Sequence, residues 1–100
     1  MDAKEIQNKV DEIINKIDTK LNVSHDANHT IIHLIEEIGE LARQINNKNI
    51  RNVEQDKANI EEELADILIL TMRLANIYNV DTESAIIGKI NKLKQRHNLT

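Results

Sequence analysis

Apolar residues recur along the chain at steps of three and four, the spacing that places side chains on one face of an α-helix. The first such stripe predicts a helix over residues 3–21 and consists of Ile6, Val10, Ile13, Ile14, Ile17 and Leu21. The second stripe predicts a helix over residues 27–46 and consists of Ile31, Leu34, Ile35, Ile38, Leu41, Ala42 and Ile45. The polar break between the stripes offers Ser24 or Asp26 as the N-cap of the second helix, because both side chains can accept a bond from a free backbone N–H.

The second half of the chain predicts two further helices. Asparagines from residue 46 onward are expected to end the second helix, and residues 46–56 are expected to form a polar connection. The next helix, residues 57–78, is apolar nearly all round in its middle, which predicts that neighbouring helices or another subunit cover it. Asp81 is a good N-cap for the last helix, residues 82–97. The residues of that helix expected to face inward are Ala85, Ile86, Ile90 and Leu93.

The composition agrees with a single all-α domain, residues 1–100, arranged as a four-helix bundle. The chain has no proline and two glycines, so nothing punctuates it as a β-rich or linker-rich protein would be punctuated. A helical layer of this length buries a thin core, so we expect a homodimer or a dimer of dimers. The absence of cysteine excludes disulfides and thiolate metal sites.

The charge and hydropathy of the chain limit the classes of partner that it is expected to bind. No apolar run approaches the ~20 residues that span a bilayer, and the charged N-terminus does not resemble a secretory signal. We therefore expect no membrane partner and a cytoplasmic location. The net charge of −4 argues against a nucleic-acid polymer, because binding to a phosphate backbone needs a basic face. A small phosphate ligand remains possible if metal ions screen the repulsion.

Two short acidic stretches carry the candidate chemistry. Glu37 and Glu40 are three residues apart on the second predicted helix, and Glu63 and Asp66 are three apart on the third, so each pair shares a face. Antiparallel packing of the two helices could bring the pairs face to face. Converging carboxylates repel one another by several kcal/mol unless cations lie between them. Hard oxygen ligands on rigid helices suit Mg²⁺, with Mn²⁺ as a possible substitute.

Asp66 is the sharpest single clue to such a site. It is the only charged residue from Leu64 through Met72, and the apolar surroundings predict that it is buried. A buried carboxylate must be paired, protonated or bound to metal, because an isolated one is very unfavourable. The simpler interpretation is a salt bridge from Asp66 to a lysine or arginine of another helix. For Glu36, Glu61 and Glu62, a solvated helix face is as good an interpretation as a functional one.

The acidic residues also carry a resemblance to a known family. Glu36-Glu37-Ile38-Gly39-Glu40 and, after the spacer 41–62, Glu63-Leu64-Ala65-Asp66 resemble the signature of the MazG-like all-α nucleotide pyrophosphohydrolases. The turn Asn79-Val80-Asp81 and Lys89 also match the layout of that family. The resemblance covers residues 27–97. It implies hydrolysis of a nucleoside triphosphate, ribo or deoxy, to the monophosphate and pyrophosphate, with housecleaning of non-canonical nucleotides as a biological role compatible with this activity.

The resemblance implies a role for each matching residue. Glu37, Glu40, Glu63 and Asp66 would ligate Mg²⁺, and the metal would bind the triphosphate and orient a water for attack at the α-phosphorus. Glu36 would either orient or deprotonate that water or be merely solvated. Lys89, Lys92 and Arg96 share a face of the last predicted helix and could hold the outgoing phosphates. An ordinary basic surface near a helix C-terminus explains Lys92 and Arg96 equally well.

Base recognition is where the chain departs from its relatives. Members of the family that the chain resembles commonly stack an aromatic side chain on the base, whereas Tyr78 is the sole Phe, Trp or Tyr here. Leu93 stands where the family often has an asparagine, which leaves a phosphate or sugar contact without its usual residue. His25, His29 and His33 are spaced by four and could line one side of the start of the second helix. They could contact a base, with His33 the member nearest the acidic stretch. Exposed histidines or, less readily, a zinc site would give the same spacing.

Three other functions are compatible with parts of this pattern. Phosphoribosyl-ATP pyrophosphatase shares the fold and the carboxylates, although Gly39 and the Glu-Leu-Ala-Asp context favour the MazG-like group. A non-catalytic helical dimerisation module would use the apolar third helix as its interface and leave the acids as surface decoration. A ferritin-like di-iron protein is disfavoured, because the chain has no Glu-x-x-His pair.

Overall fold

The computed structural model describes residues 1–51 and 57–100, with side chains described outside 47–56. In these residues the fold is all-α, with helices α1 (Ala3–Leu21), α2 (Ala27–Arg51), α3 (Lys57–Ile77) and α4 (Thr82–Arg96). The four predicted helices are confirmed. The predicted end of the second helix is wrong, because α2 continues through its asparagines to Arg51. Asparagine lowers helix propensity only modestly, so a short run of it does not end a helix. What remains of the predicted polar connection, 52–56, lies outside the described residues.

Short polar side chains fix the ends of the helices. Of the two candidate N-caps for α2, Asp26 takes the role: its Oδ1 accepts from the backbone N–H of His29 at 2.9 Å. Asp81 caps α4 as predicted and accepts from the backbone N–H of Ser84 at 3.2 Å. Asn22 ends α1 in the left-handed conformation, at φ 52°, which asparagine adopts more readily than most residues. The turns are therefore encoded by residues that supply the bonds the helix ends lack.

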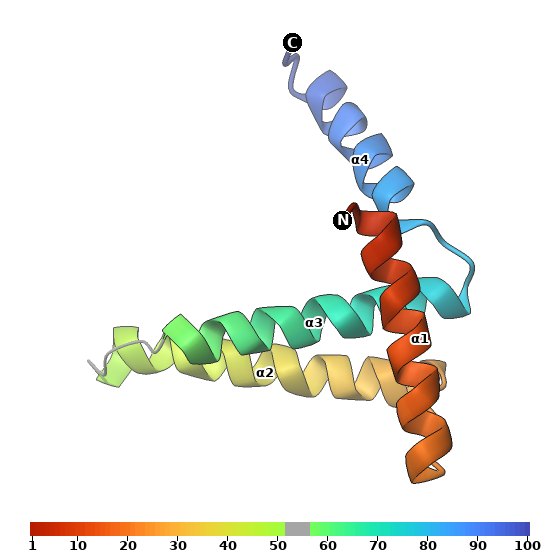
Figure 1. The fold of residues 1–100 in the computed structure, drawn as a ribbon. Coiled ribbons are helices and arrows are strands. Elements are labelled where there is room, and N and C mark those ends of the chain that lie inside the picture. Colours follow the sequence, from red (N-terminus) through yellow and green to blue (C-terminus); the bar gives the residue numbers. More distant parts are fainter. Residues whose placement is uncertain (52–56) are drawn as a thin grey trace.

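Helices α2 and α3 run side by side in opposite directions, and α1 crosses the pair near the end where α2 begins (Figure 1). The buried apolar core lies among these three helices. Its members are Val10 and Ile14 of α1, Leu34 of α2, and Leu70 and Ala75 of α3. The far end of the α2–α3 pair projects beyond α1, so there, among the described residues, the two helices have only each other as neighbours (Figure 1).

Helix α4 is joined to the rest of the fold by a buried polar network around Gln7. Its Nε2 donates to Asn76 Oδ1 at 2.9 Å and to the carbonyl of Val80 at 2.7 Å. Its Oε1 accepts from the backbone N–H of Thr82 at 3.0 Å and from the Thr82 hydroxyl at 2.6 Å. The amide thus connects α1 to the end of α3 and the first residue of α4. Because all its bonding groups are used, its burial carries no desolvation penalty for an unmade bond.

Arg73 likewise joins α3 to the middle of α1. Its side chain is only 14% exposed, and its Nε donates to the carbonyl of His25 at 3.0 Å. A terminal nitrogen reaches Asp11 Oδ1 at 3.4 Å and Asn15 Oδ1 at 3.5 Å. This arginine of α3 therefore holds both α1 and the turn that leads into α2.

Much apolar surface stays uncovered in a single chain. Leu68 of α3 is 59% exposed, so the other described helices do not provide the all-round cover expected for α3. The expectation that the apolar residues of α4 face inward is wrong for one chain: Ile86 and Ile90 are 57% and 46% exposed. Helix α4 packs against α1 and projects away from the α2–α3 pair, which leaves this stripe without a partner (Figure 1). None of the described helices combines the length and apolarity that crossing a membrane requires.

Candidate metal centre

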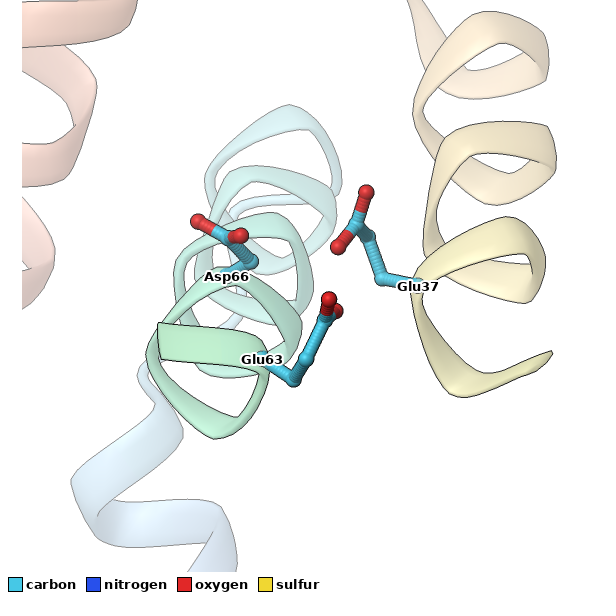
Figure 2. Close-up of side chains that lie close together, drawn as sticks. All are labelled: Glu37, Glu63 and Asp66. Carbon is cyan, nitrogen blue, oxygen red and sulfur yellow. The ribbon is translucent and has the colours of Figure 1, made fainter. Parts of the chain in front are cut away.

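The antiparallel packing of α2 and α3 brings carboxylates from both helices together. Glu37 of α2 points toward Glu63 and Asp66 of α3 across the gap between the helices (Figure 2). One carboxylate oxygen from each residue lies within 4.8 Å of the other two. Glu63 and Asp66 lie one helical turn apart, so the α3 pair predicted from the spacing does share a face. We refer to Glu37, Glu63 and Asp66 as the carboxylate cluster.

Glu63 is the most perturbed group of the carboxylate cluster. Its pKa is raised to about 7, first by a hydrogen bond to Glu37 that requires a proton, then by burial, and then by the charges of Glu37, Asp66 and Glu40. In the absence of a cation, a proton therefore bridges Glu63 and Glu37 near neutral pH. The other face of the group is unsatisfied, because Glu63 Oε2 is buried without a hydrogen-bond partner in the described structure.

These features fit a hard divalent cation. The donors are carboxylate oxygens, which suit Mg²⁺ and Mn²⁺ better than softer metals that prefer thiolate or imidazole. A cation would replace the bridging proton and offset the repulsion between three carboxylates. It would also give the buried Oε2 of Glu63 a partner. The cluster thus has the composition and the unmet electrostatic need of a metal site.

Asp66 departs from its expected burial. The side chain is exposed, although the residues on either side of it are apolar. The reason is the uncovered surface of α3: a stretch that is apolar all round is buried only where a partner packs on it. No lysine or arginine pairs with Asp66 among the described residues, so the simpler salt-bridge interpretation has no support there.

The two remaining acids of the α2 stretch lie outside the carboxylate cluster. Glu40 is half exposed and pairs with Arg43, one turn along the helix. Its charge nevertheless contributes to the raised pKa of Glu63, so the two carboxylates are close enough to interact electrostatically. Glu36 is exposed and does not belong to the carboxylate cluster. It lines a neighbouring pocket together with His25, His29 and His33.

The basic residues of α4 are not brought to the carboxylates by their own chain. Lys89, Lys92 and Arg96 are all exposed, and α4 projects away from the α2–α3 pair (Figure 1). If they act on phosphates at the carboxylate cluster, they must come from a second copy of the chain. Local spacing predicted their shared face but carries no information about where the helix points.

Each of three histidines, His25 in the turn before α2 and His29 and His33 in its first turns, contacts a carboxylate. His33 Nε2 lies 3.3 Å from Glu37 Oε1, which connects this row directly to the carboxylate cluster. His29 Nδ1 lies 2.9 Å from Asp26 Oδ1. His25 Nδ1 contacts Asp18 Oδ1. Asp18 was not among the residues predicted from the sequence, because only the turn between α1 and α2 brings it beside His25.

Asp18 titrates abnormally as a result. Burial raises the pKa of its carboxyl, but the hydrogen bonds from the backbone and the ring of His25, together with the charge of Arg73, outweigh burial and lower the pKa overall. The side chain is therefore ionised and holds the His25 ring in place. Arg73 was also missed, and its position directly after an apolar stretch was the only signal for it in the sequence.

Comparison with known proteins identifies the family of the chain. The MazG nucleotide pyrophosphohydrolase domain matches residues 23–100, and the chain belongs to that family. It is 33% identical over 66 residues, 63% of its length, to the uncharacterized protein YpjD of Bacillus subtilis (strain 168). The match spans 60% of that relative. No solved structure matches the chain significantly.

Proposed function

We propose that this protein hydrolyses a nucleoside triphosphate to the monophosphate and pyrophosphate, with Mg²⁺ held by Glu37, Glu40, Glu63 and Asp66. The observation that carries the proposal is the convergence of carboxylate oxygens from α2 and α3 within 4.8 Å. The raised pKa of Glu63 supports it, because a group that retains a proton for want of a cation is suited to exchange one for the other. Membership of the MazG family supports the choice of a nucleotide as substrate.

Each residue has a distinct task in this proposal. A bound Mg²⁺ supplies positive charge to the triphosphate oxygens and to the charge that develops during phosphoryl transfer. Glu37, Glu63 and Asp66 are already in place to hold it, whereas Glu40 must exchange its partner Arg43 for the metal. Mn²⁺ meets the same donors equally well.

The water and the phosphates need groups outside the carboxylate cluster. Glu36 directly precedes Glu37 on α2 and is exposed, so it can accept a proton from a water at the edge of the site. His33 contacts Glu37 and restricts its rotation. Lys89, Lys92 and Arg96 are the cations that could receive the pyrophosphate, if α4 of a second subunit lies over α2 and α3.

Self-association is part of the proposed function. Ile35 and Ile38 of α2 are 62% and 48% exposed, and Leu64 and Leu68 of α3 are 46% and 59% exposed. Apolar residues repeated on adjacent helices mark an interface more often than a wet surface. We place a homodimer, or a tetramer built from it, on this face. Sedimentation of the wild type should show no monomer at micromolar concentration, and a stable monomer would refute this part.

Pyrophosphate release in the presence of Mg²⁺ tests the activity directly. Canonical and modified ribo- and deoxyribonucleoside triphosphates, with phosphoribosyl-ATP as a further substrate, should include at least one that the wild type cleaves. Asp66→Asn should lower kcat by at least about a hundredfold, because it removes one metal ligand without changing the helix. The matched control is Glu62→Gln, which neutralises an exposed acid of the same helix outside the carboxylate cluster.

The outcomes separate the alternatives. Retained turnover in Asp66→Asn would remove this residue from the metal shell. No turnover of any triphosphate, together with no Mg²⁺ binding by calorimetry, would favour a non-catalytic helical module. Preference for modified over canonical triphosphates would support housecleaning of non-canonical nucleotides as the biological role.

A further inference from the structure

A hollow beside the carboxylate cluster is lined by the histidine row of α2. Its volume is about 450 Å³, within the range of small-molecule sites. The lining includes Val23, His25, His29, Ile32, His33 and Glu36. Three imidazole rings and two aliphatic side chains thus line a space that also includes Glu36 of the acidic stretch of α2. We call it the histidine hollow.

We propose that the histidine hollow binds the base of the nucleotide. This inference rests on the proposed function and names where that substrate is recognised. The connection to the reacting end is His33, which lines the hollow and also contacts Glu37 of the carboxylate cluster at 3.3 Å. Four residues of helix advance by ~6 Å, so the hollow and the cluster are about one helical turn apart. A base in the hollow therefore leaves a single sugar to reach the phosphates at the cluster.

The chemistry of the lining favours a base over a phosphate. Asp18 and Asp26 contact two of the rings, and the carboxylate of Glu36 lines the hollow itself. This negative charge repels a phosphate but tolerates a neutral, flat heterocycle with N–H groups. Imidazole rings and the sides of Val23 and Ile32 offer flat and apolar surfaces for such a ring. The shortage of larger aromatics in the chain leaves this role to histidine.

The rings are prepared for hydrogen bonding rather than for metal binding. His25 and His29 each direct Nδ1 to an aspartate, and His33 directs Nε2 to Glu37. One ring nitrogen of each histidine is thereby held, and the other has no hydrogen-bond partner in the described structure. No group of histidine nitrogens in the described part of the chain converges closely enough to hold a metal ion. The row therefore suits several separate contacts with one ligand.

His29 is the residue that tests the proposal most cleanly. Its side chain is 73% exposed, and its contact with Asp26 is made on the protein surface. The backbone N–H that Asp26 caps remains when the ring is removed, so the helix end survives the substitution. His25 and His33 are less suitable, because one fixes the turn before α2 and the other contacts Glu37. His97 at the end of α4 is a matched control for loss of an exposed histidine.

The experiment measures the affinity of the Mg²⁺-loaded protein for nucleoside 5′-monophosphates and for ribose 5-phosphate, which lacks the base. The wild type should bind at least one of AMP, GMP, CMP and UMP more tightly than ribose 5-phosphate. His29→Ala should weaken binding of that monophosphate by about tenfold, the usual effect of losing one stacking partner. It should leave ribose 5-phosphate unchanged. His29→Phe should retain most of the affinity if stacking dominates, and His97→Ala should behave as the wild type.

Failure of the inference and failure of the proposed function give different results. If the wild type releases pyrophosphate but no monophosphate binds more tightly than ribose 5-phosphate, the inference is overturned and the activity stands. Equal weakening of monophosphate and ribose 5-phosphate binding by His29→Ala would also overturn it. Ribose 5-phosphate has no base, so the loss of affinity would then not come from a contact between His29 and the base. Loss of Zn²⁺ binding in His29→Ala without any change for nucleotides would assign the row to a metal instead.

Discussion

The raised pKa of Glu63 predicts how the proposed metal binding should depend on pH. The group has a pKa of about 7 because a proton bridges it to Glu37, and a cation must displace that proton. The perturbation is a change of pH from 6 to 8 at constant ionic strength. Affinity must rise with pH, because the ionised form of Glu63 is the one that binds the cation.

The magnitude follows from the position of the pKa. With a pKa of about 7, about one tenth of Glu63 is ionised at pH 6 and about nine tenths at pH 8. The apparent affinity for Mg²⁺ or Mn²⁺ should therefore rise about tenfold over this interval and then level off. Binding at pH 6 should release close to one proton per ion, and binding at pH 8 should release almost none.

Isothermal titration calorimetry measures both quantities. Titrations in two buffers of different ionisation enthalpy give the number of protons released, and the isotherms give the affinity. Glu63→Gln should bind weakly and release no proton at pH 6, while Glu62→Gln should match the wild type because its side chain is exposed outside the carboxylate cluster. Affinity that is flat between pH 6 and pH 8, with no proton release at pH 6, would refute the bridged pair of carboxyls.

Three further predictions concern the stability of the metal-free protein. The pKa of Glu63 in the folded protein lies above its ordinary value of 4.5, so its contribution to stability is fully present below pH 4.5 and is lost as the pH rises through 7. The Tm measured in EDTA should therefore fall between pH 4.5 and pH 7. Glu63→Gln should make this fall smaller. Gln7→Ala should lower the free energy of unfolding, measured by urea denaturation, by about 2–4 kcal/mol, because several buried hydrogen bonds are lost at once. Asn8→Ala, at the exposed neighbouring position, should lower it by less than about 0.5 kcal/mol. Equal losses in the two variants would contradict the hydrogen-bond network around Gln7. Arg73→Met keeps the alkyl packing but loses the bond to the carbonyl of His25, so we expect a loss of about 1.5–3 kcal/mol and faster amide exchange in the turn before α2; an unchanged turn would show that the arginine does not hold it.

Within α3, one prediction from the sequence agrees with the structure and another does not. The pair Glu63 and Asp66 was predicted to share a face, and one carboxylate oxygen of each lies within 4.8 Å of one of Glu37 (Figure 2). The burial predicted for Asp66 was wrong, since the side chain is exposed in one chain. Spacing along a helix determines which side chains lie together, but exposure depends on which surface a neighbour covers. The covering surface belongs to the arrangement of helices and has no signature in a local window.

The sequence by itself determined the existence of the four helices, the N-cap of α4 and the spacing of the two acidic pairs. These features depend on contacts within four residues, which backbone hydrogen bonds repeat at every turn. Only the tertiary structure decided that Glu37 meets Glu63 while Glu40 pairs with Arg43, and that α4 points away from the carboxylates. Contacts between side chains of different helices depend on the angle at which the helices cross and on the rotamers that the side chains adopt. The same stripes of apolar residues are compatible with more than one crossing angle, so the sequence alone does not fix these contacts.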